Sequence, residues 1–171
     1  MTNEFLEIAK RIRDLVRKLP NDVGQMVVNY SLEAFRKEEM EGNKWQPLKD
    51  GSSDGDRTTR RGMLIKSGAL RRSIRVISIS SGKVVVGSDL KYAQIQNEGG
   101  TSHPRVTEKS RKYFWSLYEK TGNPKYKAMA LTAKNAFTVN IPARPFLKLT
   151  PELKARIEKE IETRIRLAYK F

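Results

Sequence analysis

The side chains that most often perform acid–base or metal chemistry are few in this sequence. His103 is the only histidine, and it lies in a polar, proline-flanked segment at 101–105, Thr-Ser-His-Pro-Arg. A catalytic histidine needs an orienting partner and a nucleophile, and a metal site needs several ligands. The sequence offers neither set around His103, so we expect no catalytic or metal-binding role for this side chain.

Carboxylates provide two further candidate sites, and both are weak. Asp89 and Glu98 are one acid pair that could form a carboxylate site, but only an accident of folding would join them. Asp50, Asp54 and Asp56 invite a calcium site, yet the ligand spacing and the closing glutamate of an EF-hand are missing. Cysteine is absent, which excludes disulfides and thiolate metal sites and fits assembly in a reducing cytoplasm. Nucleophile motifs and phosphate-binding loops are also missing, so we expect no cofactor and no enzymatic activity.

The charge balance points to partners rather than to chemistry. The 171 residues carry a formal net charge of +15, with a pI of about 10.1. Such an excess repels itself in the compact state and favours polyanions or an acidic partner surface. Two interpretations stay open: solubility with salt bridges to neighbouring subunits, or a surface that faces nucleic acid and releases counterions.

One stretch concentrates this positive charge. Between residues 57 and 75 there are seven cations and no acid. The seven are Arg57, Arg60, Arg61, Lys66, Arg71, Arg72 and Arg75. We call them the basic patch, and they predict either a solvated face or a surface that lies against DNA or an acidic neighbouring subunit. Arg71 and Arg72 fall near the C-terminus of a short predicted helix, where the helix dipole favours cations.

The elements around this patch centre on a predicted β-hairpin. Residues 74–79 form a β-branched run, Ser81-Gly82 interrupts it, and residues 83–86 start a second run. Two such runs around a short Ser/Gly break indicate an antiparallel hairpin. A short helix at 67–73 leads in, and about two helical turns at 92–100 lead out to paired glycines, which suit a helix C-terminus.

The N-terminal region predicts two helices. Apolar residues recur at three- and four-residue spacing from Phe5 to Leu19, so residues 3–18 form an amphipathic helix. Pro20 should end it, and a second helix, capped by Asn21 or Asp22, should run to about residue 41. The short link indicates a helical hairpin or one bent arm. Ordinary core packing explains most of the apolar stripe, and completion of part of it by a second subunit is the alternative.

The rest of the chain alternates anchors, loops and helices. Trp45 should pin a loop on the core, with its indole N–H left for one hydrogen bond. Residues 49–62 are almost without apolar side chains and predict a mobile loop. A helix with Thr107 as its cap is expected near 107–121, a shorter helix near 124–133, and a third strand at 136–141.

The last predicted element is a long helix that starts at Thr150-Pro151-Glu152. Its expected buried stripe consists of Leu153, Ile157, Ile161, Ile165 and Ala168. Together the elements predict an α+β fold in a single domain over residues 1–171. In it, a small antiparallel sheet is built on the central β-hairpin, and the N-terminal helical hairpin and the C-terminal helix pack against that sheet.

Four short motifs resemble one known family. Residues 67–74 read SGALRRSI and residues 86–100 read VGSDLKYAQIQNEGG, on either side of the hairpin turn. Trp-Gln-Pro-Leu at 45–48 lies upstream, and Ile-Pro-Ala-Arg-Pro-Phe-Leu at 141–147 lies downstream. In this order the motifs resemble the phage virion morphogenesis family, the tail-completion or neck proteins of Mu-like and P2-like tailed phages.

The resemblance implies a structural phage or prophage protein of tail completion or head–tail joining, which acts by oligomeric assembly at the neck or tail end. It implies like subunits in a ring-type homo-oligomer, other tail or head-connector proteins, and packaged DNA as partners. It also implies a location in the virion, and in the host cytoplasm during assembly. Charges interrupt every apolar run, so we expect no membrane span, and the first residues lack the basic region of a signal peptide.

Two other function classes fit the sequence less well. A free-standing basic nucleic-acid-binding protein agrees with the charge, but no aromatic side chains interleave with the basic patch as a stacking platform requires. A hydrolase or nuclease is disfavoured because the necessary acid and histidine set is missing.

Overall fold

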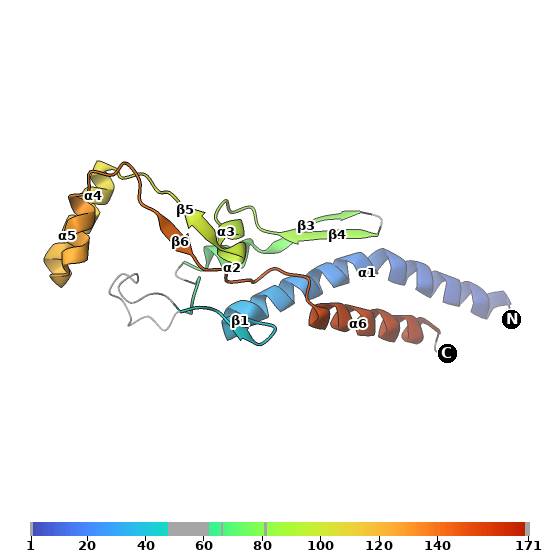
Figure 1. Cartoon of the computed structure of the whole chain (residues 1–171). Helices are drawn as coiled ribbons and strands as arrows, with labels where there is room; N and C mark the ends of the chain where they lie inside the picture. The colour runs from blue at the N-terminus through green and yellow to red at the C-terminus, as the bar shows by residue number, and fades with distance from the viewer. Residues whose placement is uncertain (1, 48–61, 66, 81, 170–171) are drawn as a thin grey trace. The chain divides into compact units, whose positions relative to one another are not determined.

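The computed structural model describes residues 2–47, 62–65, 67–80 and 82–169 (Figure 1). Their contacts divide the chain into two compact units. The main unit contains Met1–Glu98 and Ala143–Phe171, and the second unit contains Gly99–Pro142. The predicted loop at 49–62 lies outside the described residues, apart from Gly62.

A single helix, α1 (Thr2–Lys37), forms the N-terminal part of the main unit. The predicted helical hairpin is therefore wrong, because Pro20 lies inside the helix and does not end it. A proline in a helix interior removes one hydrogen bond and costs about 3 kcal/mol. The half of α1 after Pro20 packs against the central hairpin and the C-terminal helix, and this tertiary packing outweighs the local cost.

The end of α1 is fixed by Glu38, which adopts a left-handed conformation with φ of 56°. Glycine is the usual residue at such a helix end. Here two later segments hold the glutamate in place. Its C=O accepts the Trp45 N–H at 2.7 Å, and its carboxylate accepts the Met63 N–H at 2.5 Å. The helix consequently ends earlier than the predicted position near residue 41.

A small hairpin that the sequence did not indicate follows directly. Strand β1 (Glu39–Met40) pairs antiparallel with β2 (Asn43–Lys44). The connection is Glu41-Gly42, and both residues have positive φ, of 52° and 74°. Two successive positive φ values are typical of a tight type I′ turn, which matches the twist of antiparallel strands.

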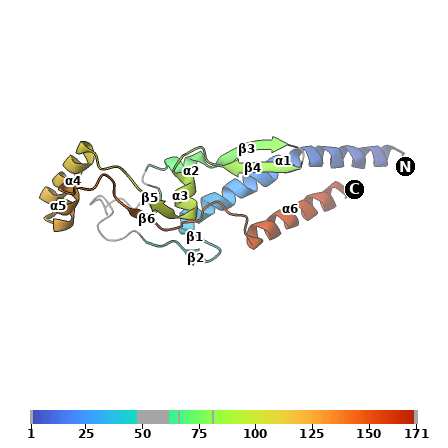
Figure 2. The ribbon, with the colours of Figure 1, turned by 45° about the horizontal axis from the view of Figure 1, so that its top comes forward.

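The predicted central hairpin is confirmed. Strand β3 (Arg75–Ser80) pairs antiparallel with β4 (Lys83–Gly87), with a register shift between Val76 and Ser78. The hairpin lies along α1 at Gly24, where an added Cβ would come within 2.7 Å of Val76 Cγ2 (Figure 2). Glycine at this helical position therefore allows the strand and the helix to approach closely.

Short helices flank the hairpin as predicted. Helix α2 (Ala69–Ser73) precedes it, with Gly68 in a left-handed conformation at the N-cap. Helix α3 (Ala93–Glu98) follows it and ends at Gly99, with φ of 75°. Both helices contribute one buried residue to the core, Leu70 from α2 and Ala93 from α3.

The C-terminal helix, α6 (Pro151–Tyr169), starts as predicted. The Thr150 hydroxyl accepts the N–H of Leu153 at 3.1 Å, and Pro151 occupies the first helical position. The helix packs along α1 and not against a sheet, which corrects the prediction. Its direction is antiparallel to α1, because Arg156 contacts Glu33 and the later Arg164 contacts Asp22.

The predicted stripe of α6 is only partly buried. Leu153 and Ala168 are buried, and Ile157 and Ile161 are half-buried, whereas Ile165 is 43% exposed. One neighbouring helix covers a narrower face than a sheet would, so the outer apolar positions stay open to solvent.

The second unit combines a two-stranded ribbon with two helices. Strand β5 (Gly100–Ser102) pairs antiparallel with β6 (Val139–Ile141). Helix α4 (Glu108–Thr121) and helix α5 (Pro124–Ala130) pack against each other through aromatic side chains. Thr107 caps α4, as predicted, through a reciprocal bond with Ser110. The predicted strand at 136–141 is shorter than expected and belongs to this ribbon.

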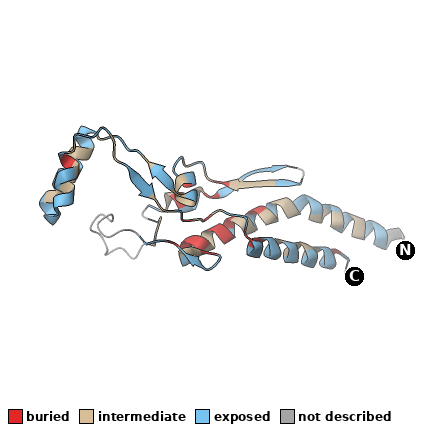
Figure 3. Cartoon of the chain, viewed as in Figure 1, coloured by how far each residue is buried: buried red, intermediate tan, exposed pale blue. Residues whose placement is uncertain are grey.

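The sheet prediction is therefore only partly confirmed. The fold is α+β, but its strands form three separate two-stranded antiparallel sheets and not one sheet built on the hairpin. The main core lies around the second half of α1, where the buried residues gather (Figure 3). Its buried members are Tyr30, Ala34, Phe35, Met40, Trp45, Leu70, Ile74, Ala93, Phe146 and Leu153.

Candidate functional site

Trp45 anchors the chain where three distant segments of the main unit meet. The indole is 3% exposed, and its N–H donates to the Pro145 C=O at 2.9 Å. The ring lies edge-on to Phe35 of α1, at 5.5 Å between centroids, and Phe35 also contacts Phe146 at 5.0 Å. The predicted anchor is confirmed, and the structure identifies the partner of the indole N–H as the 141–147 motif.

Arg144 ties the same motif to the Trp-Gln-Pro-Leu segment. It is 4% exposed, and its Nε and Nη2 both donate to the C=O of Gln46, at 3.2 and 3.0 Å. The Arg144 backbone N–H donates to the C=O of Gln96 at 3.0 Å. Burial lowers the pKa of the guanidinium from its ordinary value. This arginine therefore serves as a fixed hydrogen-bonding fork between backbone segments.

Asn97 completes the junction. Its Oδ1 accepts the N–H groups of Phe146 and Leu147, both at 2.9 Å, and its Nδ2 donates to the Leu147 C=O at 3.2 Å. One side chain thereby satisfies three backbone groups of a segment 49 or more residues away. We call Trp45, Asn97, Arg144 and Phe146 the motif junction. Sequence reasoning did not single out Asn97, because a polar residue near a helix end has no distinguishing pattern.

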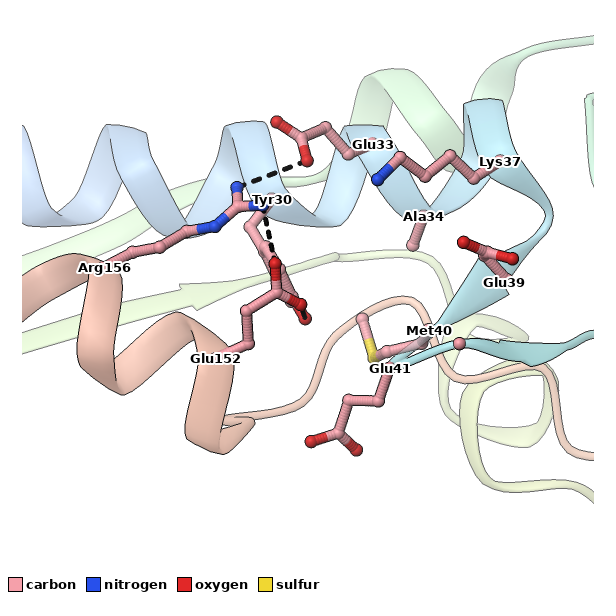
Figure 4. Close-up of a pocket in the computed structure, with 10 residues that line it drawn as sticks. Tyr30, Glu33, Ala34, Lys37, Glu39, Met40, Glu41, Glu152 and Arg156 are labelled. Atoms are coloured by element: carbon pink, nitrogen blue, oxygen red, sulfur yellow. Dashed lines mark hydrogen bonds and ion pairs between the residues drawn. The ribbon is translucent and has the colours of Figure 1, made fainter.

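A polar cluster joins α1 to the start of α6 (Figure 4). The Tyr30 hydroxyl donates to Glu152 at 3.1 Å and accepts from the Thr150 hydroxyl at 3.0 Å. Arg156 contacts Glu152 at 2.7 Å and Glu33 at 3.3 Å, and its guanidinium lies 5.3 Å from the Tyr30 ring centroid. Burial raises the pKa of Tyr30, whereas the Tyr30 and Arg156 hydrogen bonds lower the pKa of Glu152.

The cavity beside this cluster is too small for a substrate. Its volume is about 50 Å³, which accommodates little more than a water molecule or two. Each polar group of the cluster has a partner on the other helix or at its own helix start. The arrangement therefore fixes the packing of α6 on α1.

A larger apolar groove lies between α1, β4 and α6. Its volume is about 420 Å³. Its lining is apolar except for Lys148, and consists of Val23, Val27, Gly82, Val84, Val86, Leu147, Lys148, Leu149, Leu153 and Ile157. We call it the apolar groove. A hollow of this size and composition on the surface of one chain is typical of a binding surface for another molecule.

Only part of the basic patch falls on described residues. Arg71 and Arg72 lie exposed on α2, and Arg75 lies exposed on β3. Arg75 pairs with Asp89 at 3.3 Å, so a carboxylate from outside the 57–75 stretch reaches it. The other four members, Arg57, Arg60, Arg61 and Lys66, lie outside the described residues.

The acid–base candidates lie apart or have separate partners. Asp89 pairs with Arg75, and Glu98 accepts a hydrogen bond from Gln94 at 3.1 Å. His103 lies exposed in the second unit, directly after β5. Within the described part of the chain, no three His, Asp or Glu side chains are grouped to hold a metal ion. The aspartates at 50, 54 and 56 lie outside that part.

The main unit thus combines packing junctions between distant segments with an open apolar groove. A comparison with known protein families matches residues 2–166, and the chain belongs to the phage virion morphogenesis family. Members of this family are typically structural and non-enzymatic, and membership indicates a virion component that works with other virion proteins. No curated protein and no solved structure matched the chain. Among the described helices, none combines the length and apolar character that a membrane span requires.

Asn97→Ala tests the motif junction. The change leaves two buried N–H groups and one C=O without their partner, and each orphaned group costs about 1–3 kcal/mol. We expect the free energy of unfolding, measured with urea, to fall by about 2–4 kcal/mol. Gln94→Ala on the same helix removes only an exposed hydrogen bond to Glu98 and should cost a few tenths of a kcal/mol. Equal losses in the two variants would contradict the role of Asn97.

The lowered pKa of Glu152 predicts a pH-dependent stability. A carboxyl group whose pKa is lower in the folded state stabilises the fold above its unfolded pKa, ordinarily about 4.5, and loses that effect as the pH falls through the folded pKa. We expect the stability difference between the wild type and Glu152→Gln to be largest near neutral pH and to shrink below about pH 4. Urea unfolding at several pH values measures this. A difference that stays constant with pH would disprove the assignment.

Proposed function

We propose that this chain is a structural protein of tail completion or head–tail joining in a tailed phage or prophage, and that it acts by oligomeric assembly at the neck or tail end. The observation that carries the proposal is the set of large apolar side chains that the main unit leaves exposed. Phe5, Leu6 and Val16 of α1, Ile77 and Ile79 of β3, and Leu149 and Leu167 near and on α6 are all exposed.

These side chains favour association with other subunits. Isolated exposed apolar residues are normal on a protein surface, but here the same unit also carries a 420 Å³ apolar groove, and Leu149 of the set lines it. The chain has a net charge of +15, and its self-repulsion must be offset by complementary contacts. Family membership supplies the setting, since phage tails have axial symmetry and head-to-tail contacts that close form rings.

The partners follow from the same surfaces. Like subunits in a ring-type homo-oligomer use the apolar surfaces, and other tail or head-connector proteins bind at the faces of the ring. The basic patch faces packaged DNA or an acidic neighbour. The protein works in the virion, and in the host cytoplasm during assembly. No reacting group is needed for this function.

The oligomeric state tests the proposal. Light scattering and native mass spectrometry of the purified chain, alone and with tail-tube or head-connector proteins of the same phage, should detect species that are multiples of the 19.6 kDa protomer. Burial of the exposed apolar side chains drives this association. Monomers alone at high concentration, with and without those partners, would contradict it.

A free-standing nucleic-acid-binding role is the second candidate, and the second unit gives it one specific observation. Residues 99–142 contain eight cations and two carboxylates. Exposed aromatic side chains, Tyr113 and Trp115, follow Lys112 on the same helix. Positive charge beside exposed aromatic rings is the combination that binds the backbone and bases of a single strand.

Substitution of the basic patch tests whether the patch faces DNA or a neighbouring subunit. Changing Arg60, Arg61, Arg71 and Arg72 together to Ala should weaken duplex DNA binding and reduce the slope of log K against log salt by up to about four, because each lost phosphate contact removes released counterions. The control changes four exposed cations elsewhere, Lys10, Arg13, Lys154 and Lys159, to Ala. Fluorescence anisotropy at several salt concentrations measures both. If both variants bind like the wild type, or lose affinity equally, the patch does not face DNA and the subunit-contact role remains.

A further inference from the structure

The N-terminal part of α1 carries large apolar side chains that are widely exposed. Helices α1 and α6 are antiparallel: Asp22 contacts Arg164, and Tyr30 contacts Glu152. Counted from these two pairs, Tyr169 at the end of α6 lies opposite about residues 13–17 of α1. Residues 4–12 extend beyond it, and we call them the arm. Phe5 is 72% exposed, and Leu6 and Val16 are each 63% exposed.

The apolar residues of the arm lie on the same side of α1 as the residues that pack in the main unit. Phe5, Ala9, Ile12, Val16, Leu19 and Val23 follow one another at alternating spacings of four and three residues. Such spacing keeps the residues on one side of a helix and is the pattern of helix–helix packing. At Val23 and Val27 this side of α1 forms the floor of the apolar groove, between β4 and α6. Toward the N-terminus the same side continues to Val16 and Phe5, which are 63% and 72% exposed.

The apolar groove is an acceptor of matching character. An engineered cavity of about 150 Å³ takes one benzene-sized group, so 420 Å³ provides room for roughly three large apolar side chains. The arm offers Phe5, Leu6 and Ile12 within three turns of helix. Only the first turn of the arm is acidic, with Glu4 and Glu7, and Lys10 and Arg11 follow in its second turn. The two acids suit the cations at the groove. These cations are Lys83, which follows Gly82 at the edge of the groove, and Lys148, which contacts Glu41 at 3.3 Å and is part of the lining.

The arm cannot fill the groove of its own chain. Helix α1 is continuous from Thr2 to Lys37, and a helix rises about 1.5 Å per residue, so Phe5 is held roughly 27 Å along the axis from Val23. The arm of one copy can therefore enter only the groove of another copy.

We propose that the apolar groove of one copy receives the α1 arm of a second copy, and that this contact is the repeating link of the assembly. The inference rests on the proposed function and specifies the surface by which that function is achieved. Donor and acceptor lie on different parts of the surface, so the contact is heterologous. A heterologous contact leaves one free arm and one free groove at the ends of every chain of subunits, and it closes into a ring when the rotation permits.

Two variants test the link, one on each side of it. Phe5→Ser with Leu6→Ser removes the exposed apolar side chains of the arm. Leu149→Glu places a charge in the groove. Because Leu149 is 61% exposed, this change is compatible with folding. Leu131→Ser with Val139→Ser is the control, because it removes exposed apolar side chains from the second unit, which supplies neither the arm nor the groove. Circular dichroism establishes that all variants fold.

Analytical ultracentrifugation gives the outcome. The arm variant and the groove variant should each weaken self-association at least about tenfold, the effect of losing one buried large apolar side chain, and the control should not. An equimolar mixture of the two defective variants should form a dimer and nothing larger, since the intact groove of one accepts the intact arm of the other.

Other results overturn the inference in distinguishable ways. A wild type that assembles, with both variants assembling equally well, would refute the arm–groove link and leave the proposed function standing. If instead the arms of two copies pair with each other, the arm variant fails to associate and the groove variant associates like the wild type. The mixture then contains no dimer of one arm variant with one groove variant. A wild type that stays monomeric under all conditions would refute the proposed function together with this inference.

Discussion

The main unit depends on a set of backbone groups that side chains from far along the chain must satisfy. The segment around Pro145 and Phe146 is itself in no strand or helix, so it makes no regular ladder of backbone hydrogen bonds, and buried backbone groups are costly when unpaired. Asn97 and Trp45 supply the missing partners, and Arg144 of the same segment returns the contact to Gln46. These bonds span between 49 and 100 residues of sequence, so they form only when the whole unit is folded.

Helix α1 is the element on which the other parts of this unit assemble. Its second half meets the hairpin at Gly24, α6 at Tyr30 and the motif junction at Phe35. Packing on three sides explains why the helix continues through Pro20, since several faces of the helix after the proline gain tertiary contacts. The N-terminal turns lie beyond the end of α6, and there Phe5 and Leu6 are exposed. The packing of the second half of α1 and the exposure of its N-terminal turns therefore have the same cause.

Local patterns predicted the elements whose signals are local. The β-branched runs around Ser81-Gly82, the cap at Thr150-Pro151 and the cap at Thr107 all appear where expected, because each depends on a few neighbouring residues. The sequence could not reveal what depends on distant partners. Glu38 ends α1 because Met63 and Trp45 hold it, and the strand at 139–141 pairs with β5 and not with the hairpin. For the site, the anchoring role of Trp45 was predictable, but Asn97 and the apolar groove required the fold.

The bond between the Arg144 N–H and the Gln96 C=O has a consequence for how this architecture diversifies. The chain leaves the main unit after Glu98 and returns at Ala143, and the two crossing points are held next to each other by that bond at 3.0 Å. A segment whose two ends are held together can change in length at only a small entropic cost. We therefore expect insertions and deletions between residues 99 and 142 to leave the fold of the main unit largely unchanged.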